Sequence, residues 1–292
     1  MTSDGRLEVR PLTTAIGAVI DGVDISRPLG DAVISAIRDT LNRYAVVFFR
    51  DQRLTPETQV AFARQFGEPT AAHPVLPSVE GHPNVLRIDG RDDRAAWWHT
   101  DVTFMQTPPM GSILSMDEVP AVGGDTLWVS TQAAYDGLSE PVRALCDRLI
   151  ALHHDPFFAA DVAERGGMEW DGEEIVALRP AIHPVVRTHP DTGRNGLFVN
   201  PQFTRLVLGL SPIESDAVLD MLYRHLQKPE YLCRFHWEPG SVAFWDNRAT
   251  LHYAVDDYGD QMRVAHRVTL RGGAPFGPAM PAAPEPATTP NA

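Results

Sequence analysis

The feature of this chain that most restricts its fold is a series of short segments rich in β-branched and aromatic residues. Such residues favour strands, and turns containing Pro and Gly, such as HPDTG, EPG and VGGD, separate the segments. The predicted strands are YAVVFF, NVLRI, GSILSM, DTLWVS, IHPVVRTH, GLFVN, CRFHW, SVAFWD and RVAHRVTL. Because strands and helices do not alternate, a parallel doubly wound sheet is not expected. We predict an α+β, mainly β fold with a jelly-roll core (a cupin-like double-stranded β-helix) and surrounding helices.

Helices are predicted at four places. Thr55-Pro56-Glu57 combines an N-cap with Pro at the first helical position, and residues 211–214 (SPIE) form a capping box. Residues 30–44 and 141–152 show a similar pattern. The last 21 residues, from Gly272, contain six Pro and six Ala but no Lys or Arg. We therefore predict one domain over residues 1–271 and a disordered tail over 272–292.

Charge and composition restrict the partners. The formal net charge of -13 argues against nucleic acid, whose phosphates require basic patches. The longest apolar run, residues 44–49, is too short to span a bilayer, and the first ten residues contain no apolar targeting region. Cys146 and Cys233 form no C-x-x-C motif and suit a reduced compartment. We expect a cytoplasmic protein without a membrane partner. Whether the protein forms a homo-oligomer (dimer or tetramer) is left open by the sequence.

One of four H-x-[DE] pairs stands apart from the others. The pairs are His99/Asp101, His153/Asp155, His189/Asp191 and His236/Glu238. The last three lie beside turns or the end of a predicted helix, which favours a structural role. His99 and Asp101 instead lead a predicted strand, HTDVTF, where residues i and i+2 project to the same face. The pair therefore qualifies as part of a metal site.

A metal site needs a third ligand, and His252 in WDNRATLHY supplies a candidate. Two His and one carboxylate leave open positions on the metal, as in non-haem Fe(II) oxygenases. Arg263 and Arg267 would share one face of the last strand, and arginines that point inward are costly unless they meet an anion. Their guanidinium groups match carboxylate, phosphate or sulfonate oxygens, and Thr126 could add a hydroxyl.

Together these residues resemble the taurine dioxygenase (TauD/TfdA) family of Fe(II)- and 2-oxoglutarate-dependent dioxygenases. The resemblance covers nearly the whole chain, in the blocks WHTDVTF, GGDTLW, HPVVRTHP, LFVN, WDNRATLHYA and R-x-x-x-R. It implies that residues 1–271 are a catalytic domain with Fe(II) as cofactor and with 2-oxoglutarate and O2 as cosubstrates. It further implies that His99, Asp101 and His252 hold the iron, and that Arg263 and Thr126 bind 2-oxoglutarate.

The resemblance also implies a substrate site for a small anionic organosulfur compound. Its residues would be His73, Val102, Phe158, Phe203 and Arg267, with His73 and Arg267 gripping a sulfonate. The expected reaction hydroxylates the carbon next to the sulfur group and releases sulfite and an aldehyde, with succinate and CO2.

Two positions depart from the family pattern. Leu76 and Ala95 stand where taurine dioxygenase has a tyrosine and an asparagine that face the amine of taurine. Because an ammonium group would lose polar partners here, we expect an anionic head with a more apolar tail. An alkylsulfatase acting on sulfate esters is therefore the competing prediction, beside a family member acting on another small anion.

Two alternatives of other classes stay open. One is a hydrolase with zinc at the same three ligands, and the other is a β-sandwich binding module without catalysis. Residues 157–180 are predicted to be either a lid over the site or a loose surface loop.

Overall fold

The computed structural model describes residues 7–74, 76–90 and 95–282. Most of its strands belong to two antiparallel sheets. The larger sheet has the order β1 (Glu8–Pro11), β2 (Ala18–Asp21), β3 (Val46–Phe49), β16 (Val242–Asp246), β6 (Gly111–Glu118), β18 (Val264–Leu270), β5 (His82–Asp89) and β4 (Ser78–Val79). The smaller sheet has the order β15 (Leu232–Phe235), β7 (Thr126–Ser130) and β17 (Thr250–Ala254). Only the β2–β3 contact within these two sheets is parallel, so the expectation that the fold is not a parallel doubly wound sheet is confirmed.

Three smaller sheets complete the described strands. They contain β11 (Ala181–Pro184), β8 (Ile150–His153) and β14 (Thr204–Val207), then β9 (Met168–Trp170) with β10 (Glu173–Ile175), and β12 (Val186–Thr188) with β13 (Asn195–Leu197). The helices are α1 (Asp31–Tyr44), α2 (Pro56–Arg64), α3 (Thr131–Asp136), α4 (Glu140–Cys146), α5 (Pro156–Glu164), α6 (Pro212–Leu226) and the 3-10 turn η1 (Pro229–Tyr231).

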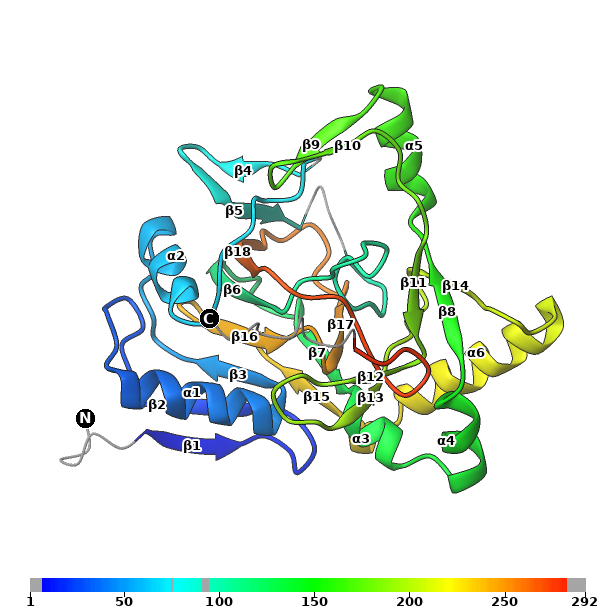
Figure 1. Ribbon diagram of the computed structural model, residues 1–292. Helices are drawn as coiled ribbons and strands as arrows, with labels where there is room; N and C mark the ends of the chain where they lie inside the picture. Colours follow the sequence, from blue (N-terminus) through cyan, green and yellow to red (C-terminus); the bar gives the residue numbers. More distant parts are fainter. Residues whose placement is uncertain (1–6, 75, 91–94, 283–292) are drawn as a thin grey trace, which may run out of the picture.

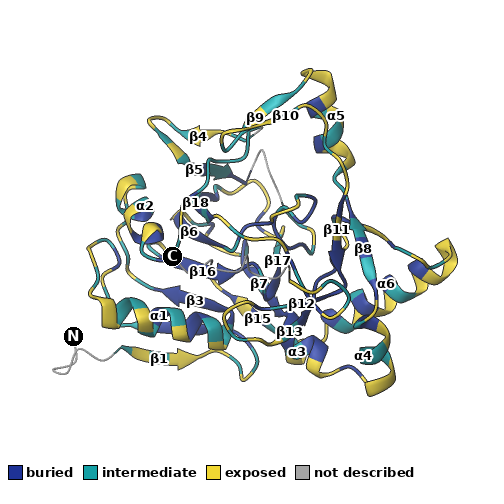
Figure 2. Ribbon diagram, in the orientation of Figure 1, coloured by how far each residue is buried: buried dark blue, intermediate teal, exposed yellow. Residues whose placement is uncertain are grey.

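The two main sheets enclose a core of large aromatic side chains. Trp128 from β7 and Phe235 from β15 pack against Phe48 and Trp245 of the larger sheet, and all four are at most 2% exposed. The outer face of the larger sheet is covered by α1 and α2 (Figure 1). Figure 2 shows the result, with the central strands buried and the β9–β10 hairpin more exposed. This packing fixes the strands whose ends carry the candidate site.

The two predicted helix starts are confirmed. Thr55 caps α2 and forms a capping box with Thr58, and Ser211 forms one with Glu214 at the start of α6. The helix predicted over 141–152 is shorter, because α4 ends at Cys146 and residues 150–153 join β8. Among the described residues, no helix combines the length and apolar character needed to cross a membrane.

Part of the predicted tail packs onto the domain. Phe276 O accepts a hydrogen bond of 2.7 Å from Thr188 N, and Pro275 and Gly277 are buried. Residues 272–282 therefore differ from the prediction of disorder, because backbone groups of β12 provide partners that composition does not reveal. Residues 283–292 lie outside the described part of the chain.

A glycine at the start of β6 tests how tightly the larger sheet is packed. A Cβ at Gly111 would lie 2.6 Å from Trp245 O, so Gly111→Ala must displace β16. We expect it to lower the free energy of unfolding by about 2 kcal/mol in urea titrations. Gly273→Ala is the control, since its Cβ would meet nothing within 4 Å. Equal stability of the two variants would contradict this packing.

Candidate active site

The structure brings the three predicted metal ligands together. One ligand atom from each of His99, Asp101 and His252 lies within 4.8 Å of the others, and all three residues are buried. Asp101 Oδ1 lies 3.7 Å from His99 Nε2 and 3.8 Å from His252 Nε2. No other group of three or more His, Cys, Asp or Glu within the described ranges could hold a metal ion. Two imidazoles and one carboxylate fit Fe(II) and leave positions open for other ligands.

A turn, rather than a strand, makes the first two ligands converge. His99 and His252 form an isolated bridge, in which His99 N donates to His252 O (3.1 Å) and His252 N donates to His99 O (2.8 Å). At Asp101 the chain enters a turn, so the prediction that this pair leads a strand was wrong. Val102 has a φ of 57°, which is rare for a β-branched residue. Tertiary contacts therefore hold this turn.

Asn247 supplies those contacts. Its Oδ1 accepts from Asp101 N (2.9 Å), and its Nδ2 donates to Asp101 O (3.0 Å) and Pro109 O (3.2 Å). Thr100 Oγ1 adds a bond of 2.8 Å to Thr250 O in the strand that carries His252. The buried Asn247 side chain thus joins the turn after β16 to the turn that presents Asp101. The sequence analysis quoted Asn247 within WDNRATLHYA but gave it no role.

The charges of the site favour an ionised Asp101 beside a neutral His252. Burial alone would raise the pKa of Asp101, but Arg267 and the two histidines outweigh it and hold the pKa at about 2. Burial and the neighbouring His99 lower the pKa of His252 well below its ordinary value. His99 Nδ1 lies 2.8 Å from Trp97 O, a contact that orients its Nε2 toward Asp101. These protonation states suit metal ligands.

A buried arginine lies in the same cavity as the two histidines. Arg263 Nε donates to Gly124 O (3.0 Å) and Nη2 donates to Thr126 Oγ1 (3.3 Å). Burial lowers the pKa of Arg263, but a guanidinium keeps its charge at neutral pH. Thr126 Oγ1 also accepts from Trp237 Nε1 (2.9 Å), which leaves its own hydroxyl hydrogen to donate. Arg263 and Thr126 can therefore bind a carboxylate.

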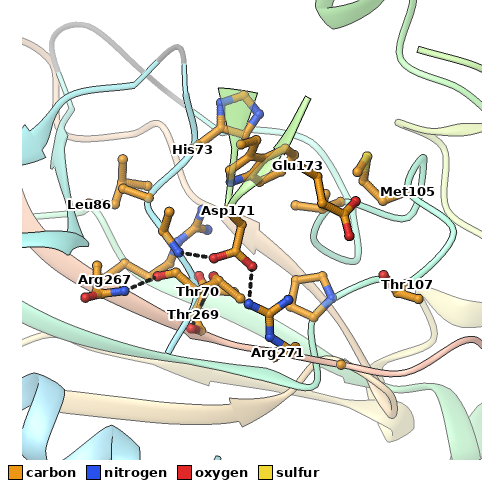
Figure 3. A pocket seen from close by; sticks show the side chains of 17 residues that line it. Thr70, His73, Leu86, Met105, Thr107, Asp171, Glu173, Arg267, Thr269 and Arg271 are labelled. Carbon is orange, nitrogen blue, oxygen red and sulfur yellow. Dashed lines mark hydrogen bonds and ion pairs between the residues drawn. The ribbon is translucent and has the colours of Figure 1, made fainter. Parts of the chain in front are cut away.

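Arg267 lies between this inner cavity and a second, outer cavity. It lines both, as does Leu86, and its Nη1 lies 3.1 Å from Asp101 Oδ1. His73 and Val102 line the outer cavity with Arg267, and Figure 3 shows His73, Leu86 and Arg267 around this pocket. Within the described residues no acceptor is paired with Val102 N. An anion at this junction would therefore meet a guanidinium, an imidazole and a backbone N–H.

The remaining predicted residues divide into two groups. Leu76 and Ala95 line the inner cavity, together with Leu86 and Ile88. Phe158 and Phe203 are buried against Phe104 in an aromatic cluster beneath the turn at 101–105. Phe158 also contacts His73, with ring centroids 5.0 Å apart. Phe203 is connected to the site through Phe104.

The three other H-x-[DE] pairs make contacts within the fold. His236 Nδ1 lies 2.8 Å from Asp125 Oδ1, and Glu238 pairs with Arg50 at 3.3 Å. His189 Nε2 binds Asp246 at 2.9 Å, and Asp191 pairs with Arg248. Asp155 caps α5. His153 is fully buried, and its Nδ1 lies 3.0 Å from Thr103 Oγ1.

Buried histidines beneath the turn predict a loss of stability in acid. His183 Nε2 lies 2.9 Å from Thr103 O and 3.0 Å from Met105 O, and burial lowers its pKa to about 4. Because the folded protein disfavours the charged form, stability is complete above pH 6.5, the ordinary value, and falls as the pH drops toward 4. We expect a loss of roughly 1.4 kcal/mol per pH unit from this group in urea unfolding. His183→Gln, which can donate to the same carbonyls, should have a flatter profile, and an unchanged slope would contradict this.

Removal of the Asn247 amide should weaken metal binding. We expect Asn247→Ala to raise the Mn(II) dissociation constant about 10- to 100-fold by calorimetry, because Asp101 loses the groups that orient it. Gln59→Ala is the matched control, since Gln59 is also buried and donates to two carbonyls (Ile113 O and His266 O) away from the ligands. Equal metal affinity of the two variants would rule out this role.

Known proteins share both the sequence and the structure. Residues 8–269 match the profile of the "Taurine catabolism dioxygenase TauD, TfdA family". The chain is 42% identical to an alpha-ketoglutarate-dependent sulfate ester dioxygenase of Pseudomonas putida, over 93% of this chain and 91% of that protein. It is 38% identical to an alkylsulfatase of Acinetobacter baylyi, over 91% of this chain and 86% of that protein. A taurine dioxygenase structure from Burkholderia xenovorans superposes with a TM-score of 0.81 and 42% identity, over 94% of each chain. The resemblance found in the sequence is thereby confirmed, and the chain belongs to the TauD/TfdA dioxygenase family.

Proposed function

We propose that this protein is an Fe(II)- and 2-oxoglutarate-dependent dioxygenase that oxidises the carbon next to the sulfur group of an alkyl sulfate ester. The products are an aldehyde and inorganic sulfate, together with succinate and CO2. Hydroxylation of this carbon gives a hemiacetal sulfate, whose C–O bond to sulfate breaks as the hydroxyl group becomes the aldehyde carbonyl.

The inner cavity carries the proposal. It is lined by His99 and His252 and by the buried Arg263 with Thr126. Arg263 is 6% exposed and its hydrogen bonds in the structure go to neutral oxygens, so an anionic ligand would compensate its charge. A dicarboxylate such as 2-oxoglutarate can reach the metal with one end and Arg263 with the other. This need for a second anion favours an oxygenase over a zinc hydrolase at the same ligands.

Fe(II), 2-oxoglutarate and O2 supply the oxidising chemistry, and the protein supplies position. His99, Asp101 and His252 would hold the metal. Arg267, His73 and Val102 N would hold the sulfate head, so that only the adjoining carbon is presented to the metal. Burial, with a contribution from Arg267, lowers the pKa of His73 to about 4, so its imidazole is neutral at pH 7 and binds as a hydrogen-bond donor.

The apolar lining of the inner cavity selects the substrate tail. Leu76, Leu86, Ile88 and Ala95 offer no hydrogen-bonding side chain to an amine. An alkyl tail gains from their contact, whereas the ammonium group of taurine would lose hydration beside these four side chains. The names of the two sulfate ester relatives agree with this choice, which places the sulfonate prediction second. Because the chain also resembles the Burkholderia xenovorans taurine dioxygenase, a sulfonate is the second candidate substrate.

We also propose that the core is the predicted double-stranded β-helix. In this proposal one wall of the core consists of β5, β18, β6 and β16 of the larger sheet. The facing wall consists of the bridge at His99 and the strands β17, β7 and β15. The metal ligands then lie between the sheets, from the bridge and its partner strand.

A substrate panel tests the function. With Fe(II) and 2-oxoglutarate, we expect kcat/KM for hexyl sulfate to exceed that for taurine at least about tenfold, measured by succinate formation and sulfate release. Turnover of butanesulfonate and hexanesulfonate tests whether sulfonates are the substrates. A preference for taurine would contradict the proposal of an apolar tail. Sulfate release without O2 and 2-oxoglutarate would identify a hydrolase. Succinate formation no faster than in His99→Ala would indicate a binding module.

A further inference from the structure

A tight hairpin lies at the outer cavity. β9 and β10 are joined by Asp171 and Gly172, whose φ angles are 55° and 82°. Two central residues with positive φ make a type I′ turn, for which Asp-Gly is a favoured pair. Trp170, Asp171 and Glu173 from this hairpin line the cavity, and Figure 3 shows Asp171 facing Arg271. Of the two predictions for residues 157–180, this docked tip agrees with a lid rather than a loose loop.

The Asp171 carboxylate joins two segments that carry proposed anion-binding groups. Its Oδ1 accepts from Ala71 N at 2.9 Å, and its Oδ2 pairs with Arg271 Nη2 at 2.6 Å. Ala71 lies two residues before His73, and Arg271 lies four residues after Arg267. One side chain of the hairpin therefore connects the loop of His73 to the strand end that follows Arg267.

The His73 loop is tethered on one side by the core. Thr70 N donates to Thr269 O (2.9 Å), and Ala72 N donates to Pro83 O (2.8 Å). The intervening Ala71 N is the amide that the hairpin holds. The hairpin also restricts the imidazole directly, because the ring centroid of Trp170 lies 4.8 Å from that of His73. The position of His73 thus depends on where the hairpin is docked.

We propose that Asp171 is a positioning residue for the organosulfur substrate. Beside an anionic head an acidic side chain would repel the ligand, so Asp171 acts through its two partners. Arg271 and the Ala71 amide compensate its charge while they fix the hairpin. The docked hairpin then orients His73 toward the head that Arg267 binds. The identity of the ligand rests on the proposed function, whereas the docking does not.

Two variants separate the side chain from the turn. Asp171→Gly removes both contacts but permits the positive φ that the turn requires. Asp171→Asn keeps an acceptor for Ala71 N and loses the ion pair with Arg271. Glu174→Ala is the matched control, an exposed acidic residue of β10 outside the cavity lining. All three keep the turn residue Gly172.

We expect KM for hexyl sulfate to rise about tenfold in Asp171→Gly and less in Asp171→Asn, because the ion pair is partly exposed to solvent. The kcat and the KM for 2-oxoglutarate should stay within about twofold, since the metal ligands and Arg263 are untouched. Amide hydrogen exchange should speed up at residues 70–73 and 168–175 in Asp171→Gly only. An unchanged KM, a loss confined to kcat, or an equal effect of Glu174→Ala would overturn the proposal.

The two proposals can fail separately. If the wild-type protein turns over none of the organosulfur compounds, the proposed function fails. The exchange measurement needs no substrate and still decides the docking. Protection at residues 70–73 that is equal in wild type and Asp171→Gly would overturn the positioning role whatever the substrate.

Discussion

Two hydrogen bonds between the main chain of Asp101 and the side chain of Asn247 determine the geometry of the candidate metal centre. They join the turn after β16 to the turn that carries Asp101, although 146 positions separate the two residues. The bridge between His99 and His252 fixes the imidazoles in the same way. With its backbone held at both points, the chain can keep Val102 at a φ of 57°, a conformation that costs on the order of 1–3 kcal/mol. Strain of this kind persists where the surroundings overdetermine the backbone.

Compensation of buried charge is the second organising constraint. Asp101 is balanced by Arg267 and the histidines, and Asp246 is balanced by Arg248 and His189. Arg263 has only neutral oxygens among its hydrogen-bond partners in the described chain. The nearby Asp125 carboxylate favours the charged form of Arg263 but is itself paired with Arg234. An anion bound beside Arg263 would therefore lower the cost of burying its charge. Arg263 therefore suits an anionic cosubstrate in the proposed function. Arg267 is already close to Asp101 and suits the substrate head.

The two cavities give the substrate a direction. Arg267 and Leu86 line both, so under the proposed function the anionic head would lie at their junction and its tail would follow the apolar wall of Leu76, Ile88 and Ala95. The outer cavity lies on the other side of the head, beneath the docked hairpin. In this proposal, recognition of the head would depend on the β9–β10 hairpin, and recognition of the tail would depend on the side chains that line the inner cavity.

Residue types and their order were sufficient to predict strands and two helix starts and to select His99, Asp101 and His252 as candidate ligands, because periodicity, capping chemistry and metal chemistry are local or compositional. The cosubstrate roles of Arg263 and Thr126 came from the family resemblance and stay proposals. The strand assigned to HTDVTF was wrong, since a side chain 146 positions away bends it into a turn. Asn247 lies in an Asp-Asn turn sequence and Asp171 in an Asp-Gly pair, so both turns can be predicted from the sequence. The sequence does not predict which distant groups these two side chains contact. The sequence by itself determined which groups are available for chemistry. The tertiary structure decided which of them meet, because hydrogen bonds between distant segments set the position of each side chain.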